Sequence, residues 1–384
     1  MFYRSFSPIL FYISWGLQFL LAAYVIVFVF YVKELKKISV KLFCFFFPWL
    51  MLSIFLTPQY DYVDHHIRTL IISFWYTFVS ILLIGYFEHK KINLHLISSS
   101  LLYIWSWLNI FLLFLFLIGL YIPPKGDFSG VFHDRNVYAI SSVLVVIFYY
   151  CTNKFCDIKI GLLAKVTITT LLISILISKS VTGFIGIIVI SIMVSQSKKT
   201  VSKAVAFFIL ISFLIAFFTI DNPLLERMSR FSMIFTGDYS QLNNNESAFL
   251  RFYLLESGWN LFIQYWQTGI GLDSARYYVF WPTDGRGTFL HNNYLDMATS
   301  GGLYVFILYF FPMLYVLFKL MVQRGLIRNR KLKLYWSLAF YTLLYKLLYN
   351  FTWPDYFEFG MVFFYILGVY SYFKFKILLA QCGS

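Results

Sequence analysis

The chain has 384 residues, of which 60% are hydrophobic, 22% aromatic and 12% charged, and its formal net charge is +14. An ordinary soluble domain has about a quarter of its residues charged and about half or fewer apolar, so this composition excludes a soluble enzyme, a disordered chain and a nucleic-acid-binding module. It indicates an all-α polytopic membrane protein in which residues 1–384 form a single integral membrane domain.

Long apolar runs along the chain predict about 11 transmembrane helices, with about 12 as the upper count, since about 20 apolar residues cross a bilayer as a helix. The first run, from Ser5 to Val32, carries no charge, and we expect it to be a retained span rather than a cleavable signal. The expected spans are 8–32, 40–57, 69–87, 97–121, 137–153, 160–178, 181–197, 204–220, 301–318, 334–352 and 360–377.

Basic residues at the span ends predict which side each connection faces. Successive connections face alternate sides of the membrane and so form two sets. One set contains 20 of the 31 basic residues and three of the 17 acidic residues, and the other contains 11 basic and 14 acidic residues. Basic residues favour the cytoplasmic side, so we expect the first set inside, together with the C-terminus, and the N-terminus outside. The outer set holds eight arginines and three lysines. Because arginine grips phosphate or carboxylate through two parallel hydrogen bonds, these arginines either bind an anionic ligand or pair with the outer acids.

One connection is much longer than the others and is the expected place for chemistry. Residues 221–300 form a large outer loop between the eighth and ninth spans, and long loops tend to carry function. The loop becomes apolar and aromatic from Phe249 to Trp266. This stretch, with Arg251 and Glu256 embedded in it, predicts a helix lying at the membrane interface.

The outer loop closes on the segment TFLHNNYLDMATSGG, which places His291 at or just before a helix N-terminus. An imidazole with a pKa of about 6.5 can accept a proton near neutral pH. Such a base beside a sugar hydroxyl, with arginines on a leaving diphosphate, would make a glycosyl-transfer site. A plain polar residue at the outer rim is the alternative.

A second polar outer connection runs from Pro123 to Asn136 and contains Arg135. Its simplest interpretation is a capped helix start, with Asp134 or Asn136 as the N-cap. The sequence has no His, Asp or Glu spacing typical of a metal site, and no nucleotide-binding loop. We therefore expect no metal and no cofactor.

Three segments together resemble a known family. The run His291-Asn292-Asn293-Tyr294-Leu295, followed by Gly302 eleven residues after the histidine, resembles the periplasmic signature of the bacterial O-antigen polymerase and O-antigen ligase superfamily, a His-Asn pair followed by nine residues and a glycine. Val305 departs from the last position of that signature. Segments 247–272 and 130–136 also resemble parts of the family pattern, and the resemblance extends over roughly residues 125–350.

The resemblance implies a membrane glycosyltransferase that inverts configuration without a metal. The donor would be a saccharide on undecaprenyl diphosphate, at the periplasmic face of the bacterial inner membrane. It implies His291 as the catalytic base and Arg251 as a ligand of the donor diphosphate. Family members often carry a second arginine after a serine, where this chain has Ser178-Lys179. Lys179, Arg135 and Arg276 are therefore the alternatives for the second cation.

The residues beside these groups are the expected substrate contacts, namely Asn292, Tyr294, Asn136 and Glu256. We favour a surface-polysaccharide polymerase, which joins lipid-linked repeat units. The alternative is an O-antigen ligase, which transfers the glycan to the lipid A core, and a transporter of lipid-linked sugars is a further one. The expected partners are the undecaprenyl-diphosphate-linked oligosaccharide and membrane lipid, with a chain-length regulator and a flippase as candidates and no nucleic acid.

Overall fold

A computed structural model describes residues 33–121, 128–130, 132, 134–155, 160–195, 247–280, 285, 287–327, 329–354, 356 and 358–383. These residues are helical apart from turns and one isolated antiparallel bridge between Phe280 and Gly287. The longer helices are α3 (Lys33–Leu56), α4 (Val63–His89), α5 (Leu94–Leu117), α6 (Arg135–Phe155), α7 (Leu162–Ile177), α8 (Val181–Ser195), α11 (Ser247–Gln264), α12 (Asn293–Val322), α13 (Arg330–Tyr349) and α14 (Phe359–Gly383).

Nine of the expected spans coincide with helices, and the other two, 8–32 and 204–220, lie outside the described residues. Six described helices are long and apolar enough to cross a membrane, namely α3, α4, α5, α6, α12 and α14. The apolar helices α7 and α8 are shorter than these. Helix α13 is not among the six, since its sequence mixes apolar residues with four basic ones. The all-α fold is confirmed for the described residues, with six candidate membrane spans, while the total of eleven spans stays a prediction.

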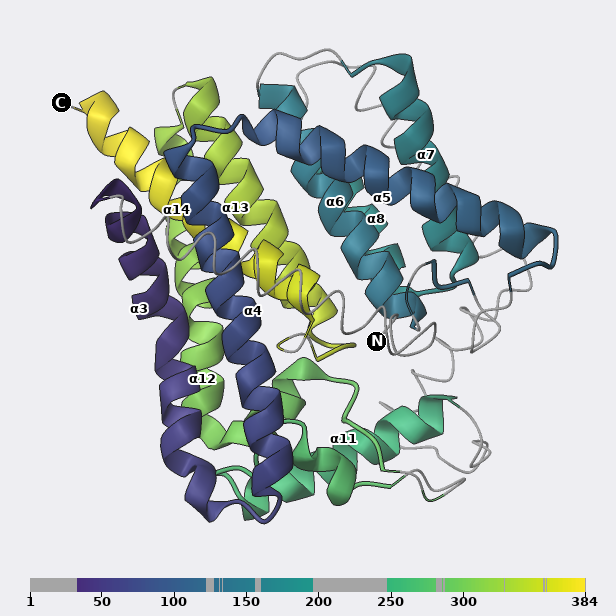
Figure 1. The fold of residues 1–384 in the computed structure, drawn as a ribbon, viewed down its shortest axis with the longest axis vertical. Coiled ribbons are helices and arrows are strands. Elements are labelled where there is room, and N and C mark those ends of the chain that lie inside the picture. The colour runs from purple at the N-terminus through teal and green to yellow at the C-terminus, as the bar shows by residue number, and fades with distance from the viewer. Residues whose placement is uncertain are drawn as a thin grey trace.

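The helices form two groups that meet along α13. Figure 1 shows α3, α4, α12, α13 and α14 on one side and α5 to α8 on the other. Helix α13 contacts α6 and α8 as well as α14. Close packing of α6 on α8 depends on Gly186, where a Cβ would lie 2.4 Å from a methyl carbon of Val143. The two groups therefore share one buried apolar core.

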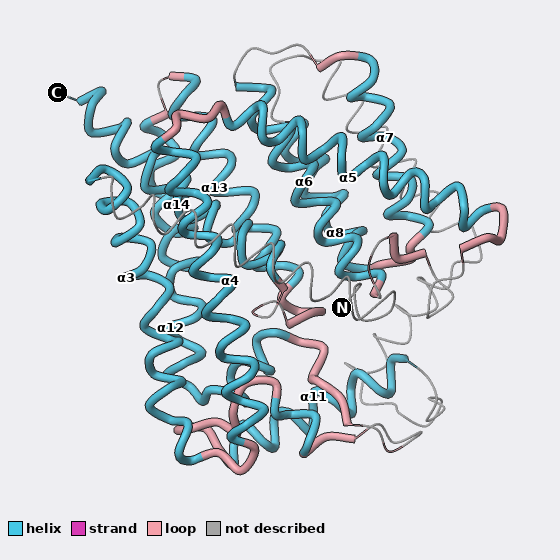
Figure 2. Tube along the Cα trace, viewed as in Figure 1, coloured by secondary structure: helices cyan, strands magenta, loops and turns pink. Residues whose placement is uncertain are grey.

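Loops and turns gather at the two opposite ends of the helices (Figure 2). The connection from α4 to α5 contains Lys90 and Lys91, and α13 begins with Arg330 and Lys331 at the same end of the molecule (Figure 1). The C-terminus of α14 also lies at this end, which we call the lysine end. The α3–α4 turn and α11 lie at the other end, which we call the loop end.

Helix α11 coincides with the helix predicted from Phe249 to Trp266, with bounds within two residues of those predicted, while its place at the membrane interface stays a prediction. It lies across the loop end, where Figure 1 shows it beside the start of α12. Its buried Leu254 joins a small second core with Ile270 and Leu290, separate from the main one. Trp259 and Ile263 on its other face are more than half exposed. This amphipathic division fits a helix at a membrane surface.

Candidate active site

His291 lies at the loop end, immediately before α12. Its φ of +52° is in the left-handed region, and the next residue, Asn292, caps the helix by accepting a hydrogen bond from the Leu295 N–H at 3.1 Å. The imidazole packs against Phe289 and Trp353, with ring-centroid distances of 4.2 and 5.8 Å. The expected position of His291 at a helix N-terminus is confirmed, and its half-buried ring is held by aromatic neighbours.

The nine residues between the His-Asn pair and Gly302 form a separate half-helix. Gly302 has φ +69° and ψ −179°, so α12 is interrupted there, and residues 293–301 precede the span proper. The span predicted to begin at residue 301 is therefore preceded by a helical segment that the hydropathy pattern did not separate.

The turn after α11 bonds to the backbone at this break. Ile270 and Gly271 donate N–H groups to the carbonyls of Thr299 and Ser300 at 3.0 and 2.8 Å, and Leu303 donates to Trp266 at 2.7 Å. A Cβ on Gly302 would lie 2.7 Å from the Gln267 carbonyl oxygen. The nine residues between the His-Asn pair and Gly302 are thus the length of a half-helix that begins after Asn292 and ends where the turn after α11 bonds to its backbone.

The connection from α13 to α14 joins the parts of the site. Asn350 accepts the backbone N–H of Asn293 at 2.7 Å and also bonds to its side chain. Thr352 bonds to Thr182 at 3.2 Å, and Trp353 contacts the His291 ring. We call residues 350–354 and 356 the joining loop, because they connect the histidine motif with the α7–α8 region.

Tyr356 of the joining loop links two acidic residues. Its hydroxyl donates to the buried Asp296 carboxylate at 2.7 Å and accepts the backbone N–H of Asp273 at 3.1 Å. Burial and the nearby Asp296 and Asp273 carboxylates raise the pKa of Tyr356. The phenol therefore stays protonated, and it connects α12 to the segment that carries Arg276.

Arg276 is held by an ion pair with Asp273, three residues earlier in the chain. Asp273 also contacts His65 of α4 at 3.1 Å. Burial lowers the pKa of Arg276, but the hydrogen bond and charge of Asp273 outweigh it, so the net shift is upward. The guanidinium is thus a fixed cation, about one third exposed at the loop end.

The α3–α4 turn and the start of α4 hold the same segment through side chains. The Tyr60 hydroxyl donates to the Thr268 carbonyl at 3.0 Å. His66 accepts the Leu272 N–H through Nδ1 at 2.9 Å. Nε2 of the same ring contacts the Ser53 carbonyl at 3.2 Å. Tyr60 in the turn and His66 in the first turn of α4 therefore fix both ends of the segment between α11 and Asp273.

A second polar group surrounds the start of α6. Asp134 accepts the Asn136 N–H at 2.8 Å, so the expected N-cap role of Asp134 is confirmed. The Asn136 side-chain oxygen accepts from Ser180 and Thr182 at 2.8 and 3.3 Å. This group contacts the joining loop through Thr352. The α7–α8 turn that carries Lys179 is therefore connected to the loop beside His291.

The structure brings only some of the expected site residues into these networks. His291, Arg276 and Asn136 each connect to the joining loop or to a residue bonded to it. Lys179 is exposed in the α7–α8 turn, with φ +52°. Glu256 is exposed on α11. Four expected residues remain. Asn292 caps α12, Arg251 lies in the second turn of α11 and Arg135 at the first position of α6. The Tyr294 hydroxyl donates to the Leu347 carbonyl at 2.6 Å.

Several central residues were not identified from the sequence, including Asp273, Asp296, Trp353, Tyr356 and His65. Asp296 and Tyr356 lie in segments that have polar density beside a span, which is a local signal. His65 and Asp273 are separated by 208 positions, so no local pattern could pair them. Across the described ranges, no cluster of three or more His, Cys, Asp or Glu residues could hold a metal ion.

Comparison with known families identifies the segment that contains this geometry. Residues 166–310 match the family model described as O-antigen ligase. The resemblance to the O-antigen polymerase and ligase superfamily is therefore confirmed. No curated protein matched the chain.

The O-antigen ligase match begins in α7 and ends within α12. It includes Lys179, Arg251, Arg276 and His291, but not the α3–α4 turn or the joining loop. The contacts that hold Arg276 and the His291 ring thus come partly from outside the matched segment. The superfamily comprises membrane glycosyltransferase-like enzymes that act on lipid-linked polysaccharides, and the match does not separate polymerases from ligases.

Proposed function

We propose that the protein is a surface-polysaccharide polymerase. It would join repeat units carried on undecaprenyl diphosphate, at the periplasmic face of the bacterial inner membrane. The observation that carries this proposal is that the O-antigen ligase match contains His291 at the start of a half-helix, on the end of the molecule opposite to the clustered lysines. Substrate on a lipid carrier would reach such a site from the membrane surface.

The proposed reaction is a single displacement. The hydroxyl oxygen of the acceptor sugar bonds to the anomeric carbon of the donor while the bond from that carbon to the diphosphate oxygen breaks. The hydroxyl proton passes to His291, and the electron pair leaves with the diphosphate. Attack from the face opposite the leaving group inverts the configuration.

Cations at the loop end would stabilise the departing diphosphate. Arg276 is oriented by Asp273, and the N-terminus of the half-helix 293–301 adds a partial positive charge. Arg251 is the proposed partner of Arg276 on the diphosphate, with Lys179 and Arg135 as the other candidates from the second polar group. Fixed charges of this kind stabilise a transition state without needing to reorganise.

The proposed substrate contacts also have structural duties. The Asn292 side-chain oxygen caps α12, so its amide N–H₂ is the group proposed to meet a sugar hydroxyl. The Asn136 side-chain oxygen accepts hydrogen bonds from two hydroxyl groups, and its amide N–H₂ is likewise the group proposed to meet a sugar hydroxyl. Tyr294 would contribute its half-buried ring, and Glu256 an exposed carboxylate on α11.

The test is to replace His291 with Ala in the native host and examine the surface glycan by gel electrophoresis. We expect the long-chain ladder to disappear and core plus a single repeat to remain. Complete loss of glycan from the core would instead support the ligase alternative. An unchanged ladder would remove His291 from the mechanism.

Arg251 offers a test of the diphosphate contact. We expect Arg251→Lys to recover little activity, because lysine keeps the charge but loses the two-pronged geometry of the guanidinium. The measurement is ladder length at matched protein level, with Arg324→Lys at the lysine end as the control. Near-normal polymerisation by Arg251→Lys would show that Arg251 is not a bidentate ligand.

A further inference from the structure

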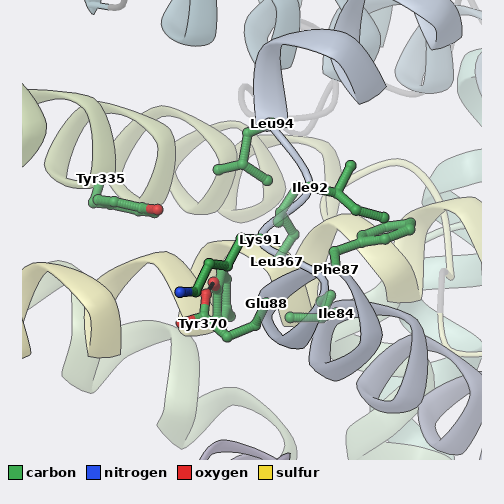
Figure 3. A pocket seen from close by; sticks show the side chains of 9 residues that line it. All are labelled: Ile84, Phe87, Glu88, Lys91, Ile92, Leu94, Tyr335, Leu367 and Tyr370. Carbon is green, nitrogen blue, oxygen red and sulfur yellow. Dashed lines mark hydrogen bonds between the residues drawn. The ribbon is translucent and has the colours of Figure 1, made fainter.

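A cavity of about 230 Å³ lies at the lysine end, far from His291. It is formed by the last turn of α4, the α4–α5 connection and the neighbouring parts of α13 and α14. Figure 3 shows Glu88, Lys91 and Tyr370 together at one side of it, while leucine, isoleucine and phenylalanine side chains and Tyr335 form the rest of the wall. The cavity is therefore amphiphilic, with one polar corner and one apolar wall.

The polar corner is organised around Glu88. Tyr370 donates its hydroxyl to one carboxylate oxygen, and the Lys374 ammonium donates to the other. The charge of Glu88 is thus matched by Lys374. Lys91 lines the same cavity, so the three charged groups sum to one positive charge.

Lys91 reaches the cavity from an unusual backbone conformation. Helix α4 ends with hydrogen bonds from Ile92 N–H to the Phe87 carbonyl at 3.0 Å and from Lys91 N–H to the Glu88 carbonyl at 3.1 Å. In this type of helix ending, the left-handed position normally holds glycine. Lys91 occupies it with φ +50°, which is energetically unfavourable for a residue with a Cβ.

We propose that this cavity binds the phosphate headgroup of an anionic phospholipid. Lys91 would supply the charge that pairs with the phosphate, Tyr335 in the cavity lining would supply a hydroxyl donor, and an acyl chain would follow the apolar wall. One net positive charge matches one phosphodiester, and the basic residues around the lysine end attract anionic lipid to it. The site is separate from glycosyl transfer and does not depend on the proposed function.

The test uses the full-length protein, delipidated in detergent and examined by native mass spectrometry. Phosphatidylglycerol and phosphatidylcholine with identical acyl chains are the probes, and glycerol 3-phosphate represents phosphate without a tail. We expect one preferred phosphatidylglycerol adduct. Lys91→Gly should weaken it by about tenfold, since a charge-assisted hydrogen bond is lost. Glycine adopts the left-handed backbone conformation without a steric penalty, so the melting temperature of the variant should equal or exceed that of the original protein.

Lys90→Gly is the matched control, because Lys90 is the neighbouring residue and does not line the cavity. We expect it to retain the adduct. Equal weakening by Lys90→Gly and Lys91→Gly would show diffuse attraction to a basic surface and overturn the proposal. Equal binding of phosphatidylcholine would overturn it as well. Competition by glycerol 3-phosphate at the same concentration as the lipid would show a free-phosphate site instead.

Discussion

At the scale of single residues, the site depends on side chains that connect distant segments. Asp273 binds Arg276 and His65, while Tyr356 bonds to both Asp273 and Asp296. Asp296 lies in the half-helix that begins immediately after the His291-Asn292 pair. The position of the Arg276 guanidinium is therefore linked, through Asp273, Tyr356 and Asp296, to the half-helix that follows His291.

Tyr356→Phe tests this connection. The variant keeps the ring but leaves the buried Asp296 carboxylate and the Asp273 N–H without their shared partner, which costs roughly 1–3 kcal/mol. We expect a lower unfolding temperature and a shortened glycan ladder at matched protein level. Tyr372→Phe, which alters a buried tyrosine inside α14, should leave the ladder unchanged. Full activity and stability in Tyr356→Phe would show that the hydroxyl does not organise the site.

At the scale of elements, the apolar runs predicted where the helices lie but not where one of them breaks. Residues 293–322 form a nearly continuous helical pattern, and the interruption at Gly302 is caused by the turn after α11 docking on its backbone. The resemblance identified Gly302 as part of a motif without indicating its conformation. Similarly, the clamp by Tyr60 and His66 depends on contacts across more than 200 positions, which no local pattern reports.

Gly302→Ala tests the break in α12. A φ of +69° combined with an extended ψ is accessible almost only to glycine, and forcing another residue into it costs roughly 1–3 kcal/mol. The added methyl would also press on the Gln267 carbonyl oxygen. We expect reduced thermal stability and loss of the ladder, because the half-helix that follows His291 would shift.

Gly360→Ala in the first turn of α14 is the matched control for the break. A Cβ there meets nothing within 4 Å, so this variant should be neutral or slightly stabilising. If Gly302→Ala behaves like Gly360→Ala, then the interruption of α12 is not needed for the fold or the activity.

At the scale of the whole molecule, the clustered basic residues and the candidate site lie at opposite ends of the long axis of the helices. The lysine end carries the amphiphilic cavity, and the loop end carries His291, Arg276 and the clamp by Tyr60 and His66. The sequence was enough to predict this polarity, because the apolar runs locate the helices and the basic residues at their ends sort the connections into two sets. The assembly of the site could not be predicted, since it requires α4, α6, α12 and the joining loop to meet in space.

The polarity predicts how each end reacts with a membrane-impermeant maleimide. In a variant without the native cysteines, one new thiol would be placed at Gln59, which is exposed in the α3–α4 turn at the loop end. A second variant would restore only Cys382, which is exposed near the end of α14. Because basic residues are retained in the cytoplasm, we expect Gln59→Cys to be labelled once the outer membrane is permeabilised, and Cys382 only after the inner membrane is also opened. The opposite order would place the lysine end outside, and His291 would then face the cytoplasm, where the proposed polymerisation could not occur.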